Sequence, residues 1–249
     1  MDEQLIPRSL IDAYGDALTM LEDESAATLS QAVAAWLESH PEIDWDELRS
    51  FATNAAYVAS TELASQSAGL SDAMAEVITG TAPQVAASVT IEVDAKAVEG
   101  TVRRQINLVR AGKPGEFAEA IGRIPKSYGK RAARERALGN VDKNVRYQRV
   151  QQGERTCTFC QMLAARGPVY VSESRAGKFR EFHKNCDCVV VPVPVGYKVE
   201  GFDAQAEYDR WQALAAIDAD DKRYPTKEAK EAAKLDLVER HPSRSLFVD

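Results

Sequence analysis

The sequence has few cysteines, and they are not spread along the chain. All four lie between Cys157 and Cys188, and the rest of the 249 residues contains none. So small a number argues against a disulfide framework in a chain of this length. Cysteines that merely fill core space would not cluster in this way, whereas thiolates that bind one metal ion must converge on it.

Long hydrophobic runs are also missing. No stretch approaches the roughly 20 apolar residues that cross a bilayer, and residues 1–7 lack the basic region and apolar run of a signal peptide. We therefore expect synthesis in the cytoplasm and no membrane partner. The sequence also contains no phosphate-binding Gly-x-x-x-x-Gly-Lys loop, no nucleophile elbow and no EF-hand loop. It therefore gives no indication of a P-loop nucleotide-binding protein, an α/β-hydrolase or an EF-hand calcium-binding protein.

Acidic and basic residues are distributed unevenly. The net charge is −7, but residues 1–101 carry −15 and residues 102–155 carry +9. A basic stretch is most often a solvated helical face. The more specific interpretation is a surface that contacts nucleic acid or an acidic partner. The candidate contact residues are Lys130, Arg131, Arg134 and Arg136. The same asymmetry would suit self-association.

Apolar periodicity predicts an α+β protein that is mainly α. We expect a helical N-terminal region over 1–124, a small zinc-stapled α/β segment over 125–196 and a polar helical tail over 197–249. Helices are expected at 9–21, 25–37, about 44–67, after 71, from 95 onward, 116–124, 127–152, 156–165, 204–217 and 226–239, and strands at 89–93, 168–171 and 188–195.

Two local signals refine these boundaries. Asp44 can cap the helix that follows the His40-Pro41 break, with Glu47 as its capping-box partner. The stretch 127–152 is expected to form one long basic helix or a pair broken at Gly139.

The cysteine cluster has the spacing of a zinc site. Cys157 and Cys160 form one pair, and after a gap of 22 residues His183 and Cys186 form another, with Cys188 as a fifth candidate. A structural zinc takes four Cys or His ligands, usually as two close pairs. We expect the ligands to be Cys157, Cys160, His183 and either Cys186 or Cys188, with Cys188 slightly favoured. The alternative set consists of all four cysteines.

The cluster admits three other interpretations. Two local disulfides would form if the protein ended up outside the cell. A redox dithiol lacks the surrounding thioredoxin-like βαβ pattern. A zinc deaminase requires a His-x-Glu motif upstream and Pro-Cys-x-x-Cys, whereas Thr156 precedes Cys157 here. Structural zinc remains the preferred interpretation.

The same segment resembles a known family. Residues 153–170, followed by His183-Lys-Asn-Cys-Asp-Cys and a Val/Pro-rich strand, resemble minor head proteins of tailed phages related to the Mu F-like head morphogenesis proteins. The strong resemblance covers 125–196, and Arg166, Gly167 and Tyr170 match as well. Many relatives have proline or aspartate after the histidine, where this chain has Lys184.

The resemblance implies a structural protein without catalytic activity. It implies a minor capsid component inside the phage head, with the portal and major capsid proteins and the packaged DNA as partners. Some relatives are described as capsid maturation proteases, but this chain shows no Ser/His/Asp pattern that would support one. The alternatives are a zinc-stabilised nucleic-acid-binding protein that acts outside a virion, and a maturation protease.

Overall fold

The chain forms two compact units. The computed structural model describes residues 4–83, 92–139, 142, 144–152, 158–169 and 188–240. The helical unit comprises Asp16–Ser71 and Ala87–Arg136, and the sheet unit comprises Met1–Gly15, Asp72–Ala86 and Ala137–Asp249. These units cut across the three consecutive segments expected from the sequence, because two long helices each contribute residues to both units.

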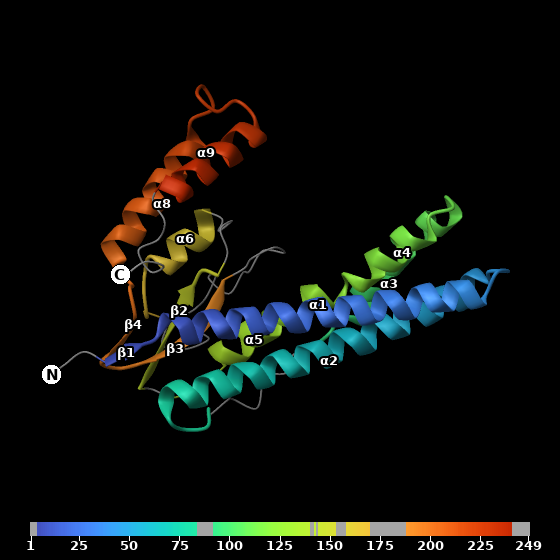
Figure 1. The fold of residues 1–249 in the computed structure, drawn as a ribbon, viewed down its shortest axis with the longest axis horizontal. Helices are drawn as coiled ribbons and strands as arrows, with labels where there is room; N and C mark the ends of the chain where they lie inside the picture. Colours follow the sequence, from blue (N-terminus) through green and yellow to red (C-terminus); the bar gives the residue numbers. More distant parts are fainter. Residues whose placement is uncertain are drawn as a thin grey trace. The chain divides into compact units, whose positions relative to one another are not determined.

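The helical unit is built on a helical hairpin. Helices α1 (Arg8–Ser39) and α2 (Trp45–Thr79) run in opposite directions, joined by a short turn (Figure 1). The sequence predicted a break in each helix, and both breaks are absent. The acidic Glu22-Asp23-Glu24 stretch contains no helix breaker, and Gly69 is tolerated within α2.

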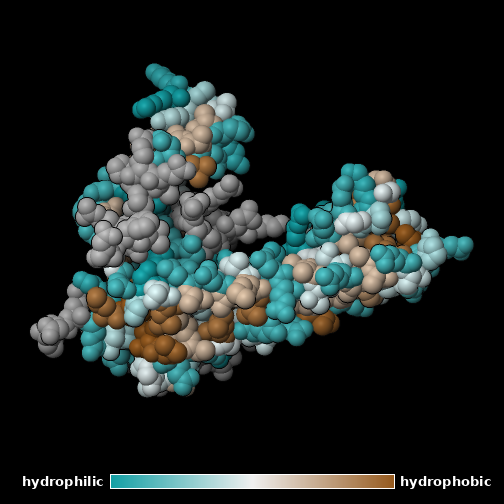
Figure 2. Space-filling view, in the orientation of Figure 1, coloured by the Kyte–Doolittle hydropathy of each residue, from teal (hydrophilic) through white to brown (hydrophobic). Residues whose placement is uncertain are grey.

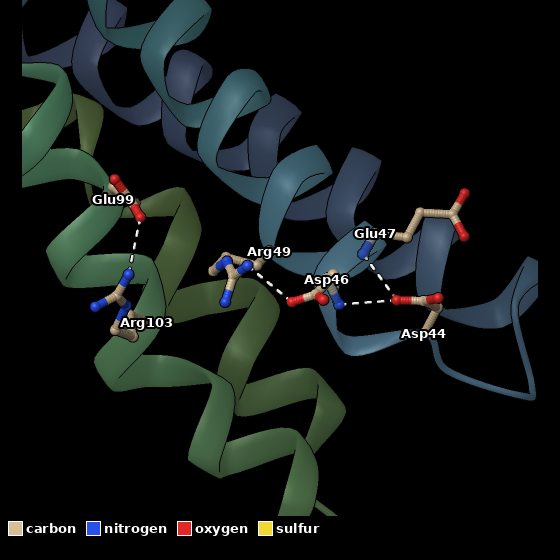
Figure 3. Close-up of polar contacts among 6 residues, drawn as sticks. All are labelled: Asp44, Asp46, Glu47, Arg49, Glu99 and Arg103. Carbon is tan, nitrogen blue, oxygen red and sulfur yellow. Dashed lines mark hydrogen bonds and ion pairs between the residues drawn. The ribbon is translucent and has the colours of Figure 1, made fainter.

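The predicted start of α2 is confirmed. The Asp44 carboxylate accepts hydrogen bonds from the backbone N–H groups of Asp46, at 2.8 Å, and Glu47, at 3.1 Å (Figure 3). These bonds satisfy two of the N–H groups that a helix start leaves without partners, and they lower the pKa of Asp44. Asp46 also forms an ion pair with Arg49 one turn further on.

Three further helices complete the helical unit. They are α3 (Ala95–Arg110), α4 (Pro114–Gly122) and the start of α5 (Gly129–Leu138), with a 3₁₀ turn, η1 (Pro125–Ser127), between the last two. Asp94 caps α3, whose buried face repeats every three to four residues. Their buried faces join those of α1 and α2 in one core, which includes Leu29, Leu48, Val98, Val102, Ile106, Phe117, Ile121 and Tyr128.

The stretch after α5 contradicts the prediction of a helix to residue 152. The helix ends at Leu138, and strand β2 (Val145–Val150) follows. Strand β2 pairs antiparallel with β3 (Val189–Pro194), from Val145 opposite Pro194 to Val150 opposite Val189. Its partner lies about 40 residues away, so the local sequence could not reveal the pairing.

Two strands near the ends of the sequence form a second, smaller sheet. Strand β1 (Gln4–Ile6) pairs in parallel with β4 (Tyr197–Val199). In the described part of the chain β3 has β2 as its single neighbour, which agrees with the edge position expected from its two prolines. The strand predicted at 89–93 falls mainly outside the described residues, and the one predicted at 168–171 is absent at 168 and 169 and otherwise outside them.

Three helices accompany these strands in the sheet unit. They are α6 (Thr158–Ala164), α8 (Ala204–Ala219) and α9 (Lys227–Arg240), close to the predicted positions. Asp203 caps α8. The fold is therefore mainly helical with a small β component, as predicted. Among the helices that the structure describes, none is long and apolar enough to cross a bilayer.

Candidate functional site

Helix α6, which carries the second cysteine of the cluster, is fixed by a buried amide. Gln161 is fully buried, and its Oε1 atom accepts a hydrogen bond from Gln151 Nε2 at 2.5 Å. Its Nε2 atom donates to the Glu207 carboxylate of α8 at 2.5 Å. Because an unmet polar group is costly in a protein interior, these bonds hold α6 between α8 and the end of β2.

The start of α6 is also anchored, and the chain is closely packed just after its end. At the start, the Thr158 hydroxyl donates to Asp218 Oδ2 at 2.7 Å, and Lys234 of α9 pairs with the other oxygen at 2.5 Å. After the end, Gly167 adopts φ +67°, and a Cβ there would lie 2.9 Å from the Phe202 ring. Glycine is therefore required at Gly167 for two reasons, backbone conformation and space.

Two of the five predicted metal ligands lie in the described residues, and both are buried. Cys160 of α6 is 1% exposed and Cys188, directly before β3, is 0% exposed. A short series of contacts connects them. Cys160 precedes Gln161, whose side chain is hydrogen-bonded to that of Gln151, directly after β2. Val150, the last residue of β2, pairs with Val189, which directly follows Cys188. The fold thus brings both cysteines to the same end of the β2–β3 sheet.

The other three predicted ligands, Cys157, His183 and Cys186, lie outside the described residues. Within the part of the chain that is described, no group of three or more His, Cys, Asp and Glu side chains is arranged to hold a metal. With three candidates outside that part, the zinc site stays a prediction, as does the choice among its ligands.

The four predicted nucleic-acid contacts all lie on α5, but their surroundings differ. Arg131 is exposed and pairs with Glu135 of the same helix at 2.7 Å. Lys130 and Arg136 are half-buried. Arg134 is 4% exposed, so its guanidinium belongs to the interior rather than to a surface that phosphates could reach. Helix α5 is thus a less continuous basic surface than its sequence suggested.

A buried carboxylate at the start of α5 was not predicted. Glu22 of α1 is 8% exposed, and its Oε1 atom accepts the backbone N–H of Lys130 at 2.8 Å. A side chain from one helix thereby satisfies the free N–H of another. Burial raises the pKa of Glu22, while this hydrogen bond and the charges of Lys130, Arg134 and Lys126 act in the opposite direction.

The position of Glu22 could have been suspected from periodicity. It lies four residues after Leu18 and seven before Leu29, on the buried stripe of α1. A lone carboxylate on an apolar helical stripe indicates a specific partner, since an unpaired one would be expensive to bury. Which helix supplies that partner could not be read from the sequence.

With this geometry established, comparison with known proteins gives the family. The VG15 protein family matches residues 6–214. The chain belongs to the VG15 family. The match spans both units, from β1 to within α8, so the family relationship covers nearly all of the architecture described above.

A relative of this VG15 chain is the Gene 15 protein of Mycobacterium phage D29. It is 33% identical over an alignment of 90 residues, which covers 25% of this chain and 32% of the relative. The chain thus aligns with about a third of that protein's length. No solved structure matches the chain. The prediction of a phage protein is confirmed at this level, whereas the relationship to Mu F-like proteins stays a prediction.

Proposed function

We propose that this VG15 protein is a minor capsid protein of a tailed phage or prophage, built into the head near the portal and the packaged DNA. The observation that carries the proposal is the family match over residues 6–214 together with a phage relative. The resemblance of 125–196 to head morphogenesis proteins supplies the more specific role. Portal protein, major capsid protein and DNA are the proposed partners.

The role we propose is structural rather than enzymatic. His40, the histidine that falls within the described ranges, stacks on Trp36 with ring centroids 4.0 Å apart. Its Nδ1 atom lies 2.8 Å from the Trp36 carbonyl oxygen. The ring is thus engaged in ending α1, which does not suit a general base that must reach a substrate.

We further propose that a zinc ion staples the segment around 150–195. Cys160 and Cys188 suit this role, because both are buried at one end of the β2–β3 sheet and thiolates are favoured zinc ligands. Cys157, His183 and Cys186 would supply the remaining ligands. A zinc ion there would contribute folding free energy to this segment, because its ligands come from parts of the chain that are far apart in sequence.

Contact with packaged DNA is the least supported part of the proposal. Of the four predicted residues only Arg131 is exposed, and its charge is already paired. DNA contact through α5 would therefore be weak, with a shallow dependence on salt, because few phosphates would be neutralised.

The test is the protein content of purified particles. Phage heads are banded on a density gradient, washed at high salt and analysed by quantitative mass spectrometry, with a non-structural phage protein as the control for carry-over. We expect the chain at a constant low copy number relative to the major capsid protein. Its absence from washed heads and procapsids, under conditions that retain the portal, would refute the proposal.

A further inference from the structure

The α1–α2 hairpin carries an apolar groove that no part of the function proposed above uses. The groove has a volume of about 640 Å³ and lies entirely within the helical unit. Its floor and walls include Leu21, Leu29 and Ala32 of α1 and Phe51, Ala55 and Val58 of α2. Figure 2 shows apolar and near-neutral residues gathered along this pair of helices. Val58, which lines the groove, is 61% exposed, so its apolar side chain is accessible to a partner.

The dimensions of the groove suit a helix. It is lined from Leu21 to Ala32 on α1 and from Phe51 to Gln66 on α2. At 1.5 Å per residue these spans are about 16 and 22 Å long, or three to four helical turns. Small side chains at Ala32, Ala55 and Ala59 leave room for a third helix to approach, as in a helical bundle.

The electrostatics of the hairpin specify the charge of that helix. Residues 16–71 contain ten Asp and Glu and one basic residue, Arg49. The groove itself is bordered by Glu24 and Glu62, both exposed, and none of its lining residues is Lys or Arg. In the described part of the chain no ion pair is recorded for either glutamate, so both charges are available to a cationic partner.

A second copy of this chain is a poor candidate for that partner. The basic helix α3 has its apolar face turned inward, with Val98, Val102 and Ile106 buried in the core of its own unit. Helix α9 also carries lysines, but Lys230 and Lys234 already form ion pairs with Asp221 and Asp218. We therefore take the occupant to be a helix of a different protein.

We infer that the α1–α2 groove is a docking site for an amphipathic helix of another protein, whose apolar stripe is flanked by lysine or arginine. Leucine-sized side chains at i, i+3, i+7 and i+10 would enter the groove along residues 51–66 of α2. The flanking cations would pair with Glu24 and Glu62. This inference is independent of the proposed place in the phage head, because it rests on the groove alone.

The test uses the full chain and a model peptide. The probe is a fluorescent helical peptide of about 14 residues with that leucine spacing and lysine on both flanks. A second peptide has the same leucine stripe with glutamate flanks, and a third has the lysine peptide's composition in scrambled order. Binding is followed by fluorescence anisotropy at low and high salt.

The variants distinguish binding in the groove from non-specific adsorption. Val58→Asp places a charge in the groove and should weaken binding of the lysine peptide at least about tenfold, as expected for an anchor position. Val77→Asp is the matched control, since Val77 is 66% exposed on the same helix but outside the groove, and it should bind like the unmodified protein. The Glu24→Gln/Glu62→Gln double variant should lose affinity at low salt and show a flatter salt dependence.

Each alternative outcome overturns the inference. Equal binding of the lysine and glutamate peptides would remove the charge argument, and equal binding of the scrambled peptide would show non-specific adsorption. Failure of every peptide to bind would refute a helix groove. A homodimer in light scattering that Val58→Asp dissociates would make a second copy the occupant. Since Val58 is largely exposed, Val58→Asp should fold, and its circular dichroism and thermal melt check this directly.

Discussion

Replacement of Gly122 by alanine, at a contact between α4 and α1, should destabilise the helical unit. The same replacement at Gly115 of α4 should not. A Cβ on Gly122 of α4 would lie 2.6 Å from the backbone oxygen of Ala26 and 3.0 Å from the Ser30 Cβ. Both atoms belong to α1, and the first cannot move without shifting that helix. Gly115, near the start of α4, has no atom within 4 Å of the corresponding position.

The magnitudes follow from two opposing terms. Alanine is favoured over glycine in a helix by up to about 1 kcal/mol, and this gain applies in part to both sites. Overpacking against a fixed neighbour costs about 1–3 kcal/mol. We therefore expect Gly122→Ala to lower the free energy of unfolding by about 2 kcal/mol, and Gly115→Ala to leave it unchanged or raise it by up to about 0.5 kcal/mol.

Urea unfolding followed by far-ultraviolet circular dichroism measures the difference. Both variants and the unmodified chain are compared at one pH, and the slope of each transition is checked because two units can unfold separately. A Gly122→Ala protein as stable as Gly115→Ala would show that α4 does not pack closely on α1, and the reasoning would be refuted.

Three further predictions concern the buried carboxylate, the helical tail and the metal. Burial raises the pKa of Glu22, so the stability that this carboxyl group contributes is fully present below its unfolded value of 4.5 and is lost as the pH rises through the folded value. The free energy of unfolding, measured against pH, should show this loss in the unmodified chain and not in Glu22→Gln. Parallel curves for the two proteins would contradict the prediction. Burial opposes ionisation of Asp218, but Lys234 and Thr158 outweigh it and lower its pKa, so the stability that this carboxylate supplies is lost as the pH falls below 3.8 through the folded value. Asp218→Asn should therefore speed hydrogen exchange in α9 at neutral pH by a modest factor, since the carboxylate is 42% exposed, and unchanged exchange would show that the pair contributes nothing. Elemental analysis should find one zinc per chain, lost in Cys160→Ser and retained in the control His40→Asn; protein without metal and with four reactive thiols would end the zinc hypothesis.

The local sequence was sufficient for most of the helical elements. The capping carboxylates Asp44, Asp94 and Asp203 lie directly before α2, α3 and α8, and each accepts hydrogen bonds from the first turn that follows. Such signals act over three or four residues and need no tertiary partner, which is why periodicity and capping residues locate a helix. The clustering of the four cysteines is likewise a property of the sequence alone.

The tertiary structure decided what depends on distant residues. Strand β2 was expected to be helical, because its partner β3 lies about 40 residues away and pairing outweighs local preference. The burial of Arg134 and of Glu22 follows from the packing of α5 against α1, which no local pattern encodes. The groove between α1 and α2 required α1 to be continuous from Leu21 to Ala32, whereas the sequence predicted a break in that stretch. The sequence thus determined the helix starts and the cysteine cluster, since each arises from near neighbours, and the fold decided which charged residues are buried and which apolar face remains open.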